Sequence, residues 1–178
     1  LWVPESSLLR VPDELLDHLG PAGCTLFQLG GTALRMVTDF VSLQPGDLVL
    51  QNAGNSGVGL MTSQLASALF SAQVVSLVRR GSKTEEEFDE LVQYLTGAGK
   101  NALVVAEEDL QDPDAMKKFQ SRLRELSGTG NLPKLSLNAV GGDSAKHLLK
   151  AIEPGGTVVT YGGMSGQPVV VGTAQLIF

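Results

Sequence analysis

Three glycines are spaced so that a phosphate could lie against bare backbone. Gly54, Gly57 and Gly59 follow the pattern G-x-x-G-x-G, a variant of the dinucleotide-binding fingerprint in which missing Cβ atoms allow a pyrophosphate to approach. The apolar run at 48–50 predicts a buried strand before them, and apolar residues recurring at three and four over 58–69 predict a helix after them. Because such a helix points its free N–H groups at whatever lies above the sheet, the pattern predicts a nucleotide-phosphate site. A tight turn in an α/β core is the plainer alternative.

Two cations stand about twenty residues beyond these glycines, at the end of the next apolar run. An enzyme that prefers NAD usually carries Asp or Glu there, which bonds the ribose 2′-hydroxyl. Arg79 and Arg80 occupy the position here, and guanidinium groups can bond a 2′-phosphate with charge-assisted geometry. The sequence therefore predicts NADP(H) as the cofactor. The alternative is a pair of solvated arginines at a strand end.

Bare backbone recurs after two later apolar runs. Gly141 and Gly142 follow one run, and Gly162 and Gly163 follow the other. Glycine at a strand end is typical of a place where a ligand approaches the backbone closely, and the carboxyl ends of parallel strands meet at one edge of a sheet. We therefore expect both pairs near a bound nicotinamide and its ribose. Taken singly, each pair would also fit an ordinary turn.

These candidate residues must be positioned by the elements around them, and the chain alternates between strand and helix patterns. Expected strands lie at 48–50, 74–78, 102–106, 135–140, 157–161 and 168–171, the last with 176–178 as an extension. A capping box at Thr84 and Glu87 marks one intervening helix, and Asp112 followed by proline marks another. Thr32 is expected to cap the helix before the first strand. Alternating elements require right-handed crossovers, which predict an α/β fold: a doubly wound, Rossmann-type parallel sheet of about six strands with helices on both faces.

Composition and charge exclude several classes of function. The mean hydropathy of +0.12 fits a globular interior, and no apolar run is long enough to cross a membrane. A net charge of −6 disfavours a nucleic acid partner bound through its phosphates. The single cysteine, Cys24, is expected to be a small buried hydrophobe, and with His18 and His147 it gives no metal-ligand spacing. We therefore expect no disulfide and no metal site.

Three segments together resemble one family. Residues 51–59, 137–142 and 156–164, with 167–170 behind them, resemble the cofactor-binding domain of the mitochondrial trans-2-enoyl-CoA reductases, which are 2-enoyl thioester reductases of the medium-chain dehydrogenase/reductase superfamily. Residues 9–12 and 32–40 resemble the end of that family's catalytic domain and the helix that follows it. The resemblance implies an oxidoreductase that transfers hydride from NADPH to a trans-2-enoyl thioester of acyl carrier protein or coenzyme A. It also implies mitochondrial fatty acid synthesis, a homodimer, and neither a nucleic acid nor a membrane as partner.

The resemblance further implies which residues contact the cofactor: a phosphate loop, a 2′-phosphate site and a nicotinamide rim. These are Asn55, Ser56, Gly57, Val58, Arg79, Arg80, Gly81, Tyr161, Gly162, Gly163 and Met164. Two departures stand out. Residues 29–31 read Leu-Gly-Gly where the family has an Asn-Pro pair, and the family's second arginine falls on Gly81, with Arg80 as its candidate substitute.

The resemblance also implies a domain division. Residues 1–30 are expected to be a lead-in from an N-terminal catalytic domain that precedes this sequence, and 31–178 to be the NADP-binding domain without its return to that domain. The family's tyrosine proton donor would lie in the preceding domain, so the segment alone is expected to bind cofactor without catalysis. Tyr94 and Tyr161 are expected to be packing residues, and His18 and His147 to face solvent.

Three other functions are alternatives to this one. A quinone oxidoreductase-like medium-chain reductase would share the fold and cofactor and differ in its substrate half. A non-catalytic NADP-binding or partner-docking module would use the edge strand expected at 168–171. A methyltransferase also has a glycine loop after its first strand, but it needs a carboxylate after the second strand, and Arg79 argues against it.

Overall fold

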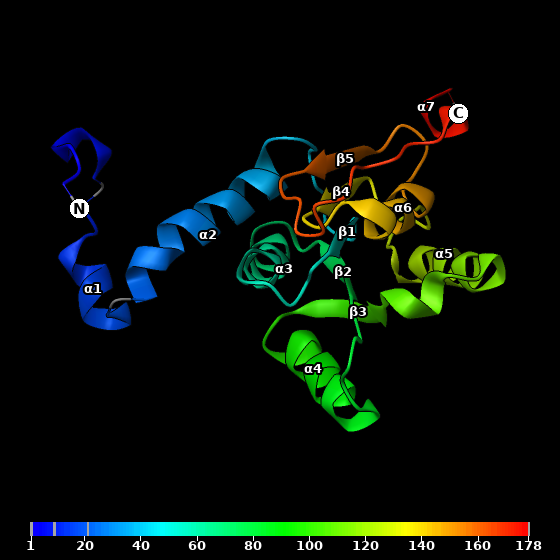
Figure 1. Ribbon diagram of the computed structural model, residues 1–178, viewed down its shortest axis with the longest axis horizontal. Helices are drawn as coiled ribbons and strands as arrows, with labels where there is room; N and C mark the ends of the chain where they lie inside the picture. Colours follow the sequence, from blue (N-terminus) through cyan, green and yellow to red (C-terminus); the bar gives the residue numbers. More distant parts are fainter. Residues whose placement is uncertain (1, 9, 21, 178) are drawn as a thin grey trace.

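Five parallel strands form the sheet around which the chain folds in the computed structural model, which describes residues 2–8, 10–20 and 22–177. The strands are β1 (Leu48–Asn52), β2 (Gln73–Val78), β3 (Asn101–Ala106), β4 (Leu135–Asn138) and β5 (Thr157–Thr160). Their order in the sheet is β3-β2-β1-β4-β5 (Figure 1). The chain therefore winds outward from β1 in one direction and then in the other, which confirms the predicted doubly wound fold and places the switch point between β1 and β4.

Helices cover both faces of this sheet and extend beyond it. They are η1 (Glu5–Ser7), α1 (Asp13–Leu19), α2 (Ala22–Thr38), α3 (Gly57–Phe70), α4 (Glu85–Gly97), η2 (Glu107–Leu110), α5 (Pro113–Leu126), α6 (Gly142–Lys150) and α7 (Thr173–Ile177). Helix α1 and the first half of α2 project away from the sheet as an arm (Figure 1). No helix in the described part of the chain combines the length and apolar character needed to span a bilayer.

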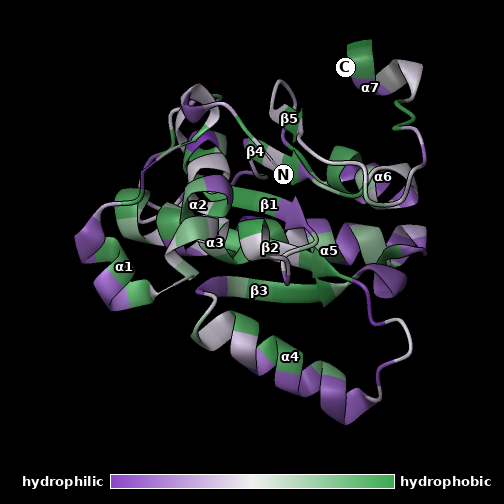
Figure 2. Cartoon of the chain, turned by 60° about the vertical axis from the view of Figure 1, so that its left-hand side comes forward, coloured by the Kyte–Doolittle hydropathy of each residue, from purple (hydrophilic) through white to green (hydrophobic). Residues whose placement is uncertain are grey.

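Burial follows the alternation of side chains along the strands. Leu48, Leu50 and Leu77 lie in one cluster with residues of α5 and α6, whereas Val49, Val74 and Leu137 lie in another with residues of α2 and α3. The strands appear as apolar ribbons between helices whose outer faces are polar (Figure 2). Burial on both faces explains why the strands read as continuous apolar runs in the sequence.

Two of the helix starts are confirmed in detail. The Thr84 side chain accepts a hydrogen bond from the backbone N–H of Glu87, and the Glu87 side chain accepts one from the backbone N–H of Thr84, which completes the predicted capping box of α4. Asp112 caps α5 by accepting from the backbone N–H of Asp114 at 2.9 Å. Each cap satisfies amide groups that the first helical turn leaves free.

The helix before β1 begins earlier than predicted. Thr32 does not cap it, because α2 already begins at Ala22 and the Thr32 hydroxyl donates to the carbonyl of Gln28 at 2.7 Å. No proline interrupts residues 22–38, and at Gly30 a Cβ would lie 3.6 Å from the Met61 sulfur on α3. Helix α2 therefore continues across residues 30 and 31 and packs against α3 at ordinary contact distance.

The sixth strand is a wrong prediction. Residues 165–172 form turns and extended chain without strand pairing, and residue 176 lies in α7; Phe178 lies outside the described residues. Gly166 has a φ of 65°, which reverses the chain, and Pro168 has no N–H to donate to a neighbouring strand. The apolar residues that suggested a strand, Val169 and Val170, are exposed.

Candidate functional site

The glycine loop between β1 and α3 is shaped by close contact inside the chain. A Cβ at Gly54 would lie 2.2 Å from the Ser76 hydroxyl, and one at Gly59 would lie 2.6 Å from the Ala53 carbonyl oxygen. Ser56 caps α3 by accepting from the Gly59 amide at 3.1 Å. The first turn of α3 still leaves amides without intrahelical acceptors, at the positive end of the helix dipole. This end of the helix can therefore bind an anion.

The two arginines after β2 point to opposite sides, as consecutive residues of an extended chain do. Arg79 is exposed at the carboxyl edge of the sheet, where it lines a pocket. Arg80 turns toward α4 and η2, where its Nη2 lies 3.2 Å from Asp109 Oδ2 and its guanidinium lies 5.0 Å from the centre of the Phe88 ring. Arg80 does not line the pocket, so only one of the two predicted cations faces it.

A carboxylate holds the turn after these arginines. The Glu108 side chain accepts from the backbone amides of Arg80 and Gly81 at 3.0 and 3.1 Å. Burial raises the pKa of Glu108, but the two backbone hydrogen bonds and the Arg80 charge outweigh it and the pKa is lowered. Gly81 has a φ of 60°, a conformation that favours glycine. The turn is thus built from hydrogen bonds and one permissive residue.

These segments meet around one polar pocket of about 390 Å³, a volume in the usual range for small-molecule sites. It is lined by Ala53, Asn55, Arg79, Gly81, Ser82, Lys83, Glu107, Val140 and Met164. The structure thus brings together Asn55, Arg79, Gly81 and Met164 of the predicted contacts. It adds Lys83 and Glu107, which the sequence reasoning missed.

Glu107 is a buried carboxylate at the end of β3. It is 7% exposed, and its Oε1 accepts from the Ser144 hydroxyl at 2.5 Å. Burial raises its pKa, against the lowering effects of the Ser144 hydrogen bond and the Arg79 charge. Its position directly after the third predicted strand, level with Arg79 after the second, is the signal by which it could have been found.

The ends of β1 and β4 are joined by buried amides. The Asn52 Nδ2 donates to Asn138 Oδ1 at 2.8 Å, and the Asn52 Oδ1 accepts from the Ala139 amide at 2.7 Å. The Asn138 oxygen also accepts from the Gly141 amide at 2.9 Å. Gly141 has a φ of 82°, and a Cβ there would lie 2.7 Å from the Gln167 carbonyl oxygen. Glycine is therefore required at this turn, which is fixed at the switch point of the sheet.

The rim formed by 161–164 divides into a buried and an exposed part. Tyr161 packs against the cluster that contains α2 and α3, and burial raises the pKa of its phenol. A Cβ at Gly162 would lie 2.7 Å from the Ala139 carbonyl oxygen, whereas Gly163 faces open space. Met164 is 66% exposed and reaches the pocket. The predicted packing role of Tyr161 is confirmed.

A scan of protein-family models finds none that matches the chain. The mitochondrial enoyl acyl-carrier-protein reductase of Xenopus tropicalis is 39% identical over 175 residues, which are 98% of this chain and 45% of that protein. The protein of the same name from Mus musculus is 43% identical over 174 residues, 98% of this chain and 42% of that protein. The chain belongs to the enoyl thioester reductase family. It spans less than half the length of these relatives.

Solved structures of the enoyl thioester reductase family share the fold. The mitochondrial 2-enoyl thioester reductase Etr1p/Etr2p heterodimer from Candida tropicalis matches with a TM-score of 0.72 and 33% identity, over 83% of this chain and 38% of that chain. A complex of Etr1p with NADP and crotonyl-CoA matches with a TM-score of 0.77 and 32% identity, over 88% of this chain and 41% of that chain. The first of these structures is of a 2-enoyl thioester reductase, and the second contains NADP, the oxidised form of the cofactor predicted for this chain.

Predictions about single residues of this family member have mixed outcomes. Cys24 is exposed, so its predicted burial is wrong: it lies near the start of α2, in the half of the helix that projects away from the sheet. His147 is 5% exposed and not solvent-facing, because α6 packs its last turns against the sheet. His18 is exposed, as predicted. Tyr94, which was expected to be a packing residue, is instead more than half exposed, at 53%. Within the described ranges, no group of three His, Cys, Asp or Glu residues is arranged to hold a metal.

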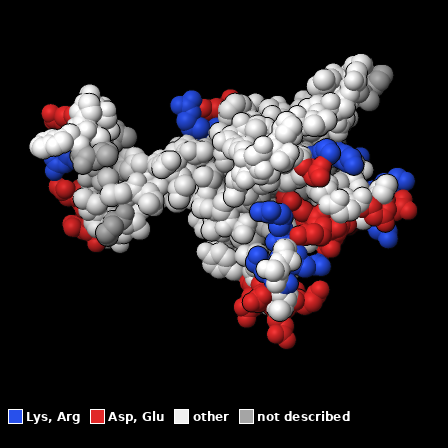
Figure 3. All heavy atoms as spheres, in the orientation of Figure 1, with Lys and Arg blue, Asp and Glu red and all other residues white. Residues whose placement is uncertain are grey.

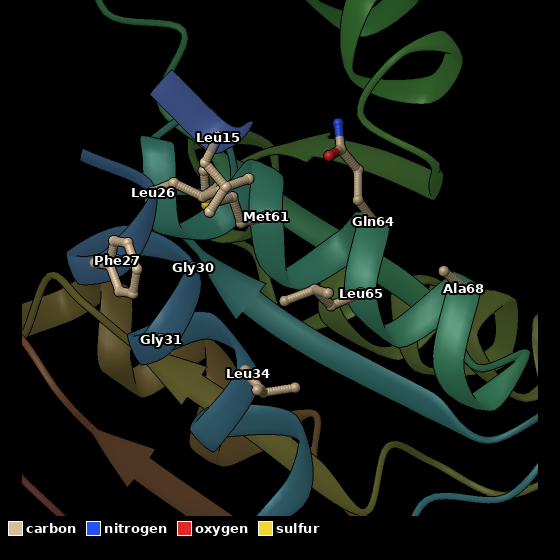
Figure 4. A pocket seen from close by; sticks show the side chains of 10 residues that line it. All are labelled: Leu15, Leu26, Phe27, Gly30, Gly31, Leu34, Met61, Gln64, Leu65 and Ala68. Atoms are coloured by element: carbon tan, nitrogen blue, oxygen red, sulfur yellow. The ribbon is translucent and has the colours of Figure 1, made fainter. Parts of the chain in front are cut away.

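A larger hollow of about 510 Å³ lies outside the polar site, between α1, α2 and α3 (Figure 4). It is lined by Leu15, Leu26, Phe27, Gly30, Gly31, Leu34, Met61, Gln64, Leu65 and Ala68. These residues include no charged group that could bind a phosphate. The smaller polar pocket is therefore the candidate cofactor site of this family member, although it is not the larger of the two.

Proposed function

We propose that the chain is the NADPH-binding part of a mitochondrial enoyl thioester reductase that reduces trans-2-enoyl groups carried by acyl carrier protein or coenzyme A. The observation that carries the proposal is the polar pocket at the switch point, where Arg79 replaces the acidic residue of NAD-dependent sheets. The names of the curated relatives support the reaction and the mitochondrial location. We also propose that residues 1–30 connect a catalytic domain to the cofactor-binding domain, which residues 31–178 form.

The pocket residues support distinct roles toward the dinucleotide. The start of α3, with Asn55, Ser56, Gly57 and Val58, offers amides and a helix dipole to the pyrophosphate. Arg79 offers a guanidinium to the 2′-phosphate, beside the turn at 80–81. Gly163, where a Cβ would meet open space next to Met164, leaves room for the nicotinamide ring.

These roles indicate which part of the reaction this chain would perform and which part it would not. Bound NADPH supplies the hydride. This chain's residues hold and orient the cofactor, and the amides and cations keep its phosphates neutralised at the edge of the sheet. Among the described residues, no tyrosine hydroxyl faces the pocket, since Tyr161 is packed and Tyr94 lies on α4. A proton donor and a thioester site are therefore proposed for the additional length that the relatives carry.

Calorimetry with the 178-residue chain tests the cofactor part of the proposal. NADPH is expected to bind more tightly than NADH, because only NADPH carries the group that Arg79 neutralises. Equal affinities would remove the argument from Arg79, and no binding of either would overturn the site. The reaction itself is tested on a protein that joins this chain to the further portion of its relatives, by NADPH consumption with crotonyl-CoA.

A second candidate function rests on one similarity. A mycobacterial quinone oxidoreductase matches with a TM-score of 0.67 and 26% identity, over 87% of this chain and 42% of that chain. A quinone reductase would use the same cofactor pocket, so the two proposals differ in the electron acceptor. Consumption of NADPH with a quinone but not with crotonyl-CoA would select this alternative. We propose a homodimer for either enzyme; the Etr1p/Etr2p heterodimer supports a dimeric assembly.

A further inference from the structure

Of the two cations predicted to bind the 2′-phosphate, only Arg79 lines the pocket in the structure. Arg80 is committed elsewhere: its guanidinium lies 3.2 Å from Asp109, 3.9 Å from Glu85 and against the face of Phe88. These partners lie on η2 and α4, on the side of the chain opposite to the pocket. Basic and acidic side chains accordingly intermingle over the region of α4 and η2 (Figure 3).

Lys83 lies where a second cation is needed. The turn that brings it there is set by Gly81 in the left-handed region and by a hydrogen bond from the Lys83 amide to the Arg80 carbonyl at 3.3 Å. Glu108 fixes the start of this turn, and the Thr84 cap of α4 fixes its end. The side chain of Lys83 lines the same pocket as Arg79.

Both pocket cations are available to a ligand. Within residues 2–8, 10–20 and 22–177, neither Arg79 nor Lys83 has a carboxylate oxygen within 4.0 Å. Glu85 is turned toward Arg80, and the Glu87 carboxylate is occupied by the Thr84 amide. Glu107 is the acidic group that lines the pocket with them.

We propose that Lys83 is a specificity-determining residue that binds the adenosine 2′-phosphate of NADPH together with Arg79, in the role that the sequence suggested for Arg80. The inference rests on the proposed function, because it assigns a residue to the same cofactor site. A phosphate monoester carries nearly two negative charges at neutral pH. One guanidinium would have to balance that charge beside the Glu107 carboxyl, whereas a guanidinium and an ammonium together match it.

Three matched variants test the assignment by calorimetry with NADPH and NADH. Lys83→Gln removes the proposed contact, Arg80→Gln removes the adjacent cation, and Lys118→Gln makes the same charge change on the exposed face of α5. Lys83→Gln is expected to weaken NADPH binding about fivefold to tenfold and to leave NADH binding unchanged. Arg80→Gln and Lys118→Gln are expected to leave the ratio of the two affinities unchanged. Lys83→Arg should retain most of the preference, because it keeps the charge.

A smaller probe separates the phosphate contact from the rest of the dinucleotide. Adenosine 2′,5′-bisphosphate and adenosine 5′-monophosphate differ by the 2′-phosphate, and Lys83→Gln should affect only the first. Unfolding temperatures of the variants verify that each is folded. If wild-type protein prefers NADPH but Lys83→Gln keeps that preference while Arg80→Gln loses it, this inference is wrong and the proposed function stands. If wild-type protein binds neither cofactor, the proposed function itself is wrong.

Discussion

The two sides of the candidate site are fixed by different forces. The glycine loop at 54–59 is held by backbone contact, since a Cβ at Gly54 or Gly59 would overlap with atoms of the chain itself. The turn at 80–83 is held by the Glu108 carboxylate and a helix cap, at the exposed surface. Steric constraints leave a fixed pattern in the sequence, whereas a hydrogen-bonded surface turn permits different residues to present the same charge. The spacing of residues therefore predicted the first side, whereas on the second side it predicted Arg79 but not Lys83.

The largest expected effect is at Gly59, on the sterically fixed side. The Gly59→Ala variant places a Cβ within 2.6 Å of the Ala53 carbonyl oxygen, so helix α3 must move away from the loop. We expect a loss of about 3 kcal/mol in the free energy of unfolding, measured by urea denaturation. Gly57→Ala is the control, because the nearest atom there belongs to the flexible Leu29 side chain. Equal losses in the two variants would contradict the steric explanation.

The next effect concerns the cofactor rather than the fold. Arg79→Ala is expected to reduce the binding free energy of NADPH by about 1.5–3 kcal/mol, because it removes a charge-assisted contact to the 2′-phosphate. NADH affinity and the unfolding temperature should change little, since Arg79 is exposed and its side chain packs against nothing that holds the fold. Calorimetric titrations with both cofactors measure the difference. A parallel loss for NADH would show that Arg79 acts on the whole dinucleotide.

A smaller effect is expected at the residue that holds the charged turn. Glu108→Gln keeps one of the two acceptor oxygens for the amides of Arg80 and Gly81, and the group is exposed. We expect a loss of about 0.5–1 kcal/mol in unfolding free energy. A modest weakening of NADPH binding should accompany it, because Lys83 is then less well placed. Glu90→Gln, on the exposed face of α4, should do neither; an equal change there would mean that net charge alone is responsible.

The smallest effect is a change in the pH dependence of stability at Glu107. Burial raises its pKa in the folded state, so the unfolded chain releases the proton first. Its contribution to stability is complete below the unfolded value of 4.5 and is lost as pH rises through the folded pKa. Glu107→Gln should remove this decline while keeping an acceptor for Ser144.

The Glu107→Gln variant separates the effect of Glu107 on stability from that of His147, which has the opposite dependence on pH. Burial lowers the pKa of His147, so stability due to His147 is present at high pH and is lost as pH falls below its unfolded value of 6.5. Unfolding free energies of wild type and Glu107→Gln are compared from pH 4 to pH 8, and the difference between the two curves reports Glu107 alone. Parallel curves would show that the carboxyl has the same pKa in both states.

Much of the fold was predictable because strand burial and helix caps are local signals. The runs at β1 and β2, the capping box at Thr84 and the cap at Asp112 all lie where the sequence indicated. The errors concern tertiary context. The segment at 168–171 has a strand composition but no neighbouring strand to pair with. Helix α2, which packs against α3, begins at Ala22 rather than at Thr32.

The sequence predicted which turns form the candidate site better than it predicted which charged side chains face the pocket. The order of elements places Gly54, Arg79 and Gly141 at one edge of a parallel sheet, and that requires no knowledge of side-chain direction. The choice between Arg80 and Lys83 depends on which way each residue points and on the acidic partners that η2 supplies. Glu107 was missed, and His147 was wrongly expected to face solvent, because the burial of a polar residue shows only once the elements are packed.

The amide bridge between Asn52 and Asn138 has a consequence for the thermodynamics of binding. Because this bridge holds the turns at the centre of the site through hydrogen bonds within the chain itself, a dinucleotide that binds there has little protein backbone to order. Preorganisation of this kind lowers the entropic cost of association. The remaining entropic cost comes from ordering long surface side chains such as Lys83. A nucleotide without the 2′-phosphate loses the contact to Lys83, but it also does not have to order that side chain.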